Sequence, residues 1–145
     1  MTSERAPHEN LYTRLQAGAD GIGVFAIRDI PEGTVLFAGD MDTTTRVLPS
    51  KVENIDDEEI RRMYVEFCPM IEGAFVAPKD FNKMTMGWYL NHSDNPNVAS
   101  DKSLRFTTTK FIAKGEELRT DYRVYSDNAA ELIASWRDGG TTRTD

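Results

Sequence analysis

Two polar segments in the second half of the chain carry side chains that could hold and act on a ligand. Asn91-His92-Ser93 opens the pattern N-H-S-x-x-P-N, and the pattern E-L-x-x-D-Y ends at Tyr122. Each pattern alone is ambiguous, because N-H-S is also a glycosylation acceptor and E-L-x-x-D-Y fits the end of an ordinary strand. Their occurrence together, in this order, indicates a site.

A glycine pair near the N-terminus, Gly21 and Gly23, is a third candidate. Glycine lacks the Cβ atom that would keep a ligand away from the main chain. In isolation, G-x-G is more typical of a glycine-rich hairpin. Structural alternatives exist for the polar residues as well: a turn residue for Asn91, a hydrogen-bonding residue for His92, and a core or rim position for Tyr122.

Length and composition predict a single folded domain. The chain has 145 residues, of which 39% are hydrophobic, enough for one core and too few for two ordinary domains. No apolar run is long enough to span a membrane, and residues 1–10 lack the apolar core of a signal peptide. We therefore expect an intracellular protein, cytoplasmic or nuclear, that is not secreted and has no membrane partner.

The charge and the metal-binding residue types narrow the function classes further. One cysteine, Cys68, excludes an intrachain disulfide, and with only two histidines a structural zinc site is not expected. The net charge of −7 disfavours direct nucleic-acid binding, which needs clustered Lys and Arg. It suits a basic protein or peptide as partner, although solubility alone explains the acidity equally well.

Short strands separated by turn residues dominate the expected secondary structure. The patterns predict strands at 23–27, 34–37, 70–77 and 104–112, with a turn at 31–33. A helix is expected to begin at Asp56, with Glu59 completing a capping box, and to run to Phe67. A short helical turn is expected within 81–90, and a last helix from Asp127 to Trp136.

Two stretches share one spacing of Ile, Gly and Leu, namely Ile30 to Leu36 and Ile112 to Leu118. This repeat predicts two copies of a strand, a glycine-dependent turn and a second strand, with chance similarity as the alternative. Many short strands and little helix favour a mainly β (α+β) fold over α/β winding.

Taken in order, these motifs resemble the signatures of SET-domain protein lysine methyltransferases over about residues 18–125. The segments that carry the resemblance are Gly21-Ile22-Gly23, the turn from Asp29 to Gly33, Asn91-His92-Ser93 and Tyr122. The resemblance implies a SET-domain β-clip fold with a C-terminal pseudoknot and S-adenosylmethionine (AdoMet) as cofactor, without a metal. The layout is similar to minimal free-standing SET proteins of viruses and bacteria, some of which are dimers, so a homodimer is compatible with it.

The resemblance also implies roles for individual residues. Tyr122 takes the position of the catalytic tyrosine. The cofactor-binding residues implied are Gly21, Ile22, Gly23, Tyr89, Asn91, His92 and Tyr122, and the substrate-channel residues are Phe37, Thr120 and Tyr125.

The implied reaction is in-line displacement of a methyl group from a sulfonium by a lysine amine of a protein, a histone being one candidate. Lysine has a pKa of about 10.4 and is almost fully protonated at neutral pH. A narrow apolar channel would lower that pKa, and Tyr122 would orient the amine.

The chain departs from the family at several positions. Phe37 stands where many members have a tyrosine, Trp88 where many have an arginine, and Asp94 where many have a cysteine. Thr120 replaces an aromatic residue, and its smaller side chain would leave room for higher methylation. Trp136 is expected either to close the site or simply to anchor the last helix.

The expected organisation is a leader at 1–10, a SET domain at 11–125 with a variable insert at 41–82, and a C-terminal helix and tail at 126–145. The acidic run from Asp56 to Glu59 could receive basic residues of the substrate, or simply favour a helix start. Two other functions remain open. One is a SET-like module that binds AdoMet or peptide without turnover, and the other is a β-clip domain without a cofactor.

Overall fold

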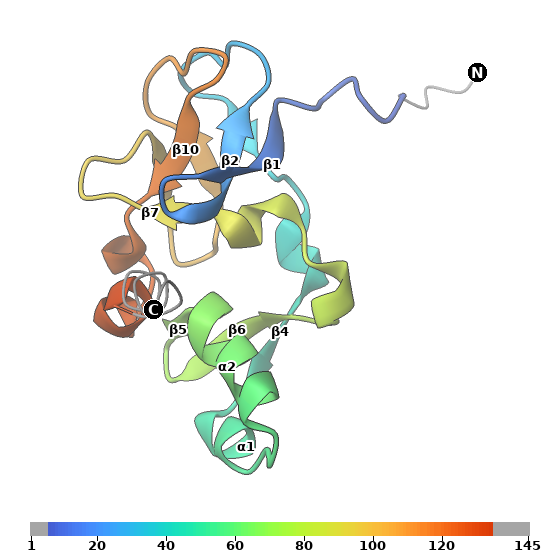
Figure 1. Cartoon of the computed structure of the whole chain (residues 1–145), viewed down its shortest axis with the longest axis vertical. Helices are drawn as coiled ribbons and strands as arrows, with labels where there is room; N and C mark the ends of the chain where they lie inside the picture. Colours follow the sequence, from blue (N-terminus) through green and yellow to red (C-terminus); the bar gives the residue numbers. More distant parts are fainter. Residues whose placement is uncertain (1–5, 135–145) are drawn as a thin grey trace.

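The computed structural model describes residues 6–134, which form two β-sheets with short helices around them. Figure 1 shows the larger sheet at one end of the molecule and the helices α1 (Pro49–Glu53) and α2 (Glu58–Phe67) at the other. The predicted mainly β fold with few short helices is confirmed. None of the helices within this described part has the length and apolar character needed to cross a membrane.

The larger sheet brings the two polar motifs together. Its strands are, in order, β1 (Thr13–Gly18), β2 (Gly21–Ala26), β10 (Glu117–Thr120), β8 (Val98–Ser100), β9 (Phe106–Thr108) and β3 (Val35–Leu36), with β7 (Asn91–His92) beside β10. Strands β7 and β8 both run parallel to β10, whereas β2 pairs with β10 in the antiparallel sense. The N-H-S segment and the E-L-x-x-D-Y segment are therefore neighbours.

The core of this sheet consists of aliphatic side chains. Val24, Val98 and Leu118 are fully buried at 0% exposure, together with Ile30 and Ile112. The expected strand at 104–112 is shorter than predicted and is confined to β9. Leu104 adopts a left-handed backbone conformation with φ of 55°, which ends the extended run on that side.

The repeat in the sequence corresponds to a structural pair. Ile30 and Ile112 donate a backbone N–H to each other's carbonyl oxygen, at 2.8 and 2.9 Å. Each isoleucine is followed by a turn in which a glycine has positive φ, 84° at Gly33 and 94° at Gly115. The expected glycine turn followed by a strand is thus present twice, leading into β3 and β10, whereas the first strand of each copy is only an isolated bridge between the two isoleucines.

The smaller sheet contains β4 (Thr44–Val47), β6 (Ala74–Pro78) and β5 (Met70–Ile71), in that order. The prediction of one strand over 70–77 is wrong, because the chain reverses at Glu72 and Gly73, which have φ of 52° and 83°. Positive φ at both central residues is typical of a two-residue hairpin turn. Gly73 in the middle of the run was the signal for this turn.

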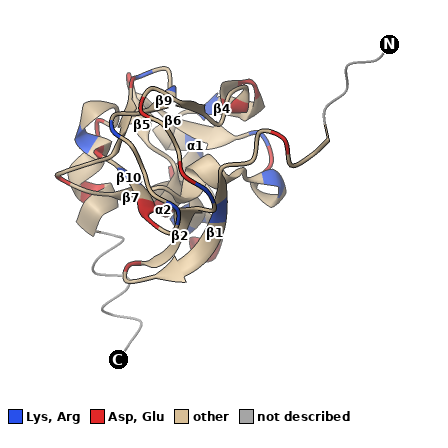
Figure 2. Cartoon of the chain, turned by 90° about the horizontal axis from the view of Figure 1, so that it is seen from above, with Lys and Arg blue, Asp and Glu red and all other residues tan. Residues whose placement is uncertain are grey.

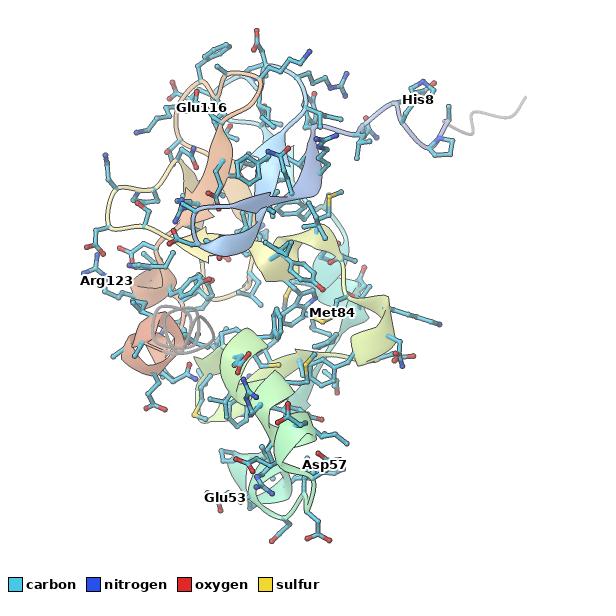
Figure 3. The ribbon with its side chains drawn as sticks, viewed as in Figure 1. His8, Glu53, Asp57, Met84, Glu116 and Arg123 are labelled. Atoms are coloured by element: carbon cyan, nitrogen blue, oxygen red, sulfur yellow. The ribbon has the colours of Figure 1, made fainter. Side chains whose placement is uncertain are left out.

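Helix α2 covers the smaller sheet. It begins one residue later than predicted: Asp57, not Asp56, is the N-cap, and its carboxylate accepts the N–H groups of Glu59 and Ile60. The ring of Tyr64 packs edge-to-face against Phe75 and Phe81, with centroid distances of 6.1 and 5.0 Å. Figure 3 shows Asp57 at the end of the molecule opposite Glu116.

Short 3₁₀ helices connect the sheets. They are η1 (Asp40–Thr43), η2 (Phe81–Lys83), η3 (Met86–Tyr89) and η4 (Tyr122–Val124). The helical turn expected within 81–90 is confirmed by η2 and η3. Residues 129–134 are helical, so the last helix begins later than the expected Asp127, and Trp136 lies outside the described residues.

Charged residues of both signs are interspersed over the described part of the chain. Figure 2 shows acidic and basic positions on the larger sheet and on the connecting segments. The net charge of −7 therefore arises from an excess of acidic residues among mixed charges.

Candidate active site

Tyr122 lies directly after β10, at the start of η4, and is only 5% exposed. Its hydroxyl donates a hydrogen bond to the carbonyl oxygen of Leu90 at 2.6 Å, and its backbone N–H donates to Nδ1 of His92 at 3.2 Å. Burial raises the pKa of the Tyr122 phenol well above its ordinary value. The hydroxyl therefore stays protonated, with its lone pairs directed away from Leu90 and able to accept a proton donor.

His92 has both ring nitrogens engaged. Because Nδ1 accepts the N–H of Tyr122, the proton of the neutral ring is on Nε2, which lies 2.8 Å from Oδ1 of Asp94. The hydrogen bond from His92, with the charge of Arg123, lowers the pKa of the Asp94 carboxyl. His92 thus connects Tyr122 to the loop after β7, a supporting role rather than that of a general base.

Asn91 is 3% exposed and joins three strands. Its side-chain Nδ2 donates to the carbonyl oxygen of Ile22 in β2 at 3.3 Å and to Oε2 of Glu117 in β10 at 2.8 Å. The amide therefore fixes the backbone of the glycine segment relative to the N-H-S segment.

Gly23 is required by this close approach. A Cβ atom there would lie 2.3 Å from Oε2 of Glu117 and 3.0 Å from Nδ2 of Asn91. Gly21 has positive φ at 89° and is the exposed first residue of β2, directly after the β1–β2 hairpin turn. The adjoining Ile22 is 43% exposed. The backbone of the glycine segment, Gly21-Ile22-Gly23, is therefore in contact with Asn91 and also close to the surface.

A charged network that the sequence analysis did not single out lies against this segment. The guanidinium of Arg119 contacts Asp20 at 2.7 Å and Glu117 at 2.6 Å, and it donates to the carbonyl oxygen of His92 at 3.2 Å. The side chain of Glu117 is 12% exposed. In the sequence, the only indication of this network was that Glu117 is the first residue of the E-L-x-x-D-Y motif. The pairing of Asp20 with Arg119 could not be predicted, because the two residues are distant in sequence.

We expect Gly23→Ala to displace the Glu117 carboxylate from Asn91 and Arg119. Loss of hydrogen bonds to a largely buried carboxylate costs about 1–3 kcal/mol of unfolding free energy, measurable by urea denaturation. In a Glu117→Ala background the same glycine substitution should cost less, because the obstructing carboxylate is gone. An equal cost in both backgrounds would contradict this explanation of Gly23.

A pocket opens between the two sheets on the other side of Tyr122. Its lining includes the buried residues Leu90, Phe106, Tyr122 and Tyr125 and the less buried residues Asp40, Met41, Thr44 and Glu66. The pocket holds about 610 Å³ of empty space, including the part open to solvent. Tyr125 packs edge-to-face against both Tyr122 and Phe106, each at 6.2 Å between ring centroids. These residues form an apolar, aromatic cavity, and the Tyr122 side chain is part of its wall.

The other sequence-predicted residues lie around this pocket. Phe37 packs its ring edge against Phe106 at 5.9 Å and has φ of 55°, and Tyr89 packs against Phe67 at 5.6 Å. Thr120 is 1% exposed and its hydroxyl lies 3.4 Å from that of Ser100. Of the predicted channel residues, Tyr125 lines the pocket, whereas Phe37 and Thr120 are not among the residues that line it. Their channel roles stay predictions.

Among residues 6–134, no three His, Cys, Asp or Glu side chains are grouped closely enough to hold a metal ion.

Asp121 caps η4 by accepting the N–H of Arg123, and its carboxylate lies 3.7 Å from Nδ1 of His92. The hydrogen bonds of the Asp121 carboxylate are thus with Arg123, from its backbone N–H and its guanidinium.

Comparison of the sequence and the structure with known proteins identifies the family of this chain. The model of the SET domain matches residues 21–123. No curated protein sequence is a significant match. Among solved structures, a Plasmodium falciparum putative histone methyltransferase has 19% identity and a TM-score of 0.47, covering 77% of this chain and 92% of that one. The structure of apo ctPRC2 with mutations in Ezh2 has 22% identity and a TM-score of 0.57, covering 82% of this chain and 16% of that chain.

The extent of the family match decides the assignment. It includes the glycine segment, the N-H-S segment and Tyr122, and it spans well over half of the 145 residues. The likeness to the Ezh2-containing structure concerns the fold alone. The chain belongs to the SET domain family.

Proposed function

We propose that this protein transfers a methyl group from AdoMet to the side-chain amine of a lysine in a protein substrate. The observation that supports it most is the position of Tyr122, buried in the wall of an aromatic pocket and bonded directly to the Asn91–His92 segment. Tyr122 thereby connects the Asn91–His92 segment, which is implied in cofactor binding, with an aromatic pocket that suits the apolar part of a lysine side chain.

The residues beside β2 fit AdoMet. Its amino-acid end carries both an amine and a carboxylate, and the glycine segment lies beside Glu117 and Arg119, which have the complementary charges. Because Gly23 has no side chain, Asn91 and Glu117 can approach its backbone closely. The residues that would hold the cofactor are thus the glycine segment, Asn91, His92 and Glu117. When bound, AdoMet supplies an electrophilic methyl group on a sulfonium.

The pocket residues would prepare the nucleophile. The aromatic walls formed by Phe106 and Tyr125 disfavour a charged amine, which lowers the pKa of an entering lysine. The Tyr122 hydroxyl donates its own proton to Leu90, so its oxygen is left to accept an N–H of that lysine and orient the amine. Tyr122 itself is not required to lose its proton.

A SET-like module that binds without turnover is the second candidate, and Phe37 favours it. Where many family members have a tyrosine, Phe37 has no hydroxyl, and its ring packs against Phe106. This candidate predicts AdoMet or peptide binding without methylation of any lysine.

Calorimetric titration of AdoMet into the wild-type protein tests the cofactor half of the proposal. We expect saturable one-to-one binding, and a rise in the unfolding temperature as AdoMet concentration increases, because a ligand that binds only the native state stabilises it. Absence of both heat and stabilisation would contradict the proposal and favour a β-clip domain without a cofactor.

A further inference from the structure

One partly buried residue of the pocket lining, Asp40, is a carboxylate without a cationic partner in the described part of the chain. Asp40 begins η1, and its Oδ2 accepts a hydrogen bond from the hydroxyl of Thr85 at 2.6 Å. Partial burial raises the pKa of the Asp40 carboxyl, although the Thr85 hydrogen bond opposes this. Within residues 6–134, Asp40 forms no ion pair.

Glu66, the other acidic residue of the pocket, differs in this respect. Its carboxylate pairs with Arg62 at 2.8 Å along the same helix, α2. A cation therefore already lies against Glu66. Asp40, in contrast, has no Arg or Lys partner in the described part of the chain. A positively charged group that enters the pocket can therefore pair with the Asp40 carboxylate.

The 3₁₀ helix η3 approaches Asp40 and contributes an aromatic residue to the same pocket. A Cβ atom on Gly87 would be 3.3 Å from Oδ2 of Asp40 and 3.2 Å from the ring of Phe37, so η3 approaches Asp40 closely. The next residue, Trp88, is half-buried and also lines the pocket. A carboxylate in a pocket with aromatic walls suits a guanidinium, which can pair with the carboxylate through two N–H groups and is more weakly hydrated than a lysine ammonium.

We propose that Asp40 is a specificity-determining residue that binds a basic side chain, preferentially arginine, adjacent to the target lysine in the substrate. Asp40 and Tyr122 line the same pocket, Asp40 partly buried and Tyr122 only 5% exposed, so a basic side chain at Asp40 and a lysine at Tyr122 can belong to one peptide. This inference rests on the proposed function, since it assumes that the pocket receives a lysine-containing peptide.

The test compares arginine with citrulline, its neutral and nearly isosteric counterpart, in fluorescein-labelled peptides that place this residue directly before or directly after a lysine within glycine flanks. Fluorescence anisotropy gives Kd for the wild type, for Asp40→Asn and for Asp42→Asn. Asparagine at position 40 can still accept the Thr85 hydrogen bond. Asp42→Asn is the matched control, because Asp42 is an exposed residue of the same 3₁₀ helix outside the pocket and its substitution removes the same charge.

For at least one of the two placements, we expect the wild type to bind the arginine peptide about 10-fold more tightly than the citrulline peptide, equivalent to about 1.4 kcal/mol. Asp40→Asn should reduce that ratio to about 2-fold or less, whereas Asp42→Asn should leave it unchanged. The inference is overturned if the wild type shows no preference, if the preference survives Asp40→Asn, or if Asp42→Asn removes it equally.

Methylation of the same peptides, followed by mass spectrometry with AdoMet present, separates this inference from the proposed function. Methyl transfer without an Asp40-dependent arginine preference contradicts the role of Asp40 and leaves the methyltransferase intact. An Asp40-dependent preference in binding, without methylation of any peptide, supports the Asp40 site and contradicts the proposed catalysis.

Discussion

Tyr122→Phe is expected to abolish most methyl transfer while leaving AdoMet binding nearly intact. The substitution removes the oxygen that would orient the lysine amine, and misplacement of a reacting group costs about 100-fold or more in rate. It also leaves the Leu90 carbonyl without its donor, which should cost about 1–2 kcal/mol of stability. Initial rates of methyl transfer to a lysine peptide, measured at a temperature where the variant is fully folded, check the prediction.

Tyr12→Phe is the control for this variant. It makes the same chemical change at a tyrosine whose ring lies against Arg28, 4.3 Å from the guanidinium carbon, and not in the pocket. We expect wild-type rates from it. A Tyr122→Phe protein that is folded and transfers methyl groups at the wild-type rate would exclude a catalytic role for Tyr122.

Asn91→Ala is expected to weaken AdoMet binding about 10- to 100-fold, equivalent to about 1.4–2.8 kcal/mol. The variant loses the amide that holds the Ile22 carbonyl and the Glu117 carboxylate in place. The glycine segment and Glu117 are then free to shift from the positions that would receive the cofactor. Calorimetric titration of AdoMet measures the change, with the unfolding temperature recorded in parallel.

Asn95→Ala is the matched control, because Asn95 is an exposed turn residue after the same motif. Its affinity for AdoMet should equal that of the wild type. If Asn91→Ala is folded and binds AdoMet as the wild type does, the cofactor site does not lie at Asn91, and the arrangement proposed for β2, β7 and β10 is wrong.

Much of the fold and part of the site could be predicted from local patterns. The glycine at position 33 predicted a turn that the structure contains, and the Ile30 and Ile112 repeat predicted the paired turns. The order of the two polar motifs predicted that the segments of Asn91 and Tyr122 lie together, and strands β7 and β10 bring them together. These predictions succeeded because each depends on residues close in sequence or on a pattern of motifs.

The remaining features depend on contacts between distant segments. Nothing near Arg119 in the sequence indicates its ion pair with Asp20, because that pair exists only once the β1–β2 hairpin turn reaches β10. The position of Asp40 in the pocket likewise depends on η3, 45 residues further along the chain, which supplies Thr85 as its partner. Local patterns also placed the start of α2 at Asp56, since Asp56 and Asp57 are equally good caps in composition and only the geometry selects Asp57.

The central claim is that Tyr122 serves methyl transfer from AdoMet to lysine. The most direct measurement is mass spectrometry of an arginine- and lysine-containing peptide after incubation with AdoMet and either the wild type or Tyr122→Phe. The account predicts methyl additions on the peptide lysine with the wild type and almost none with the variant. Saturable AdoMet binding by the wild type with no methyl added to any lysine peptide would contradict the claim and support a binding module without turnover.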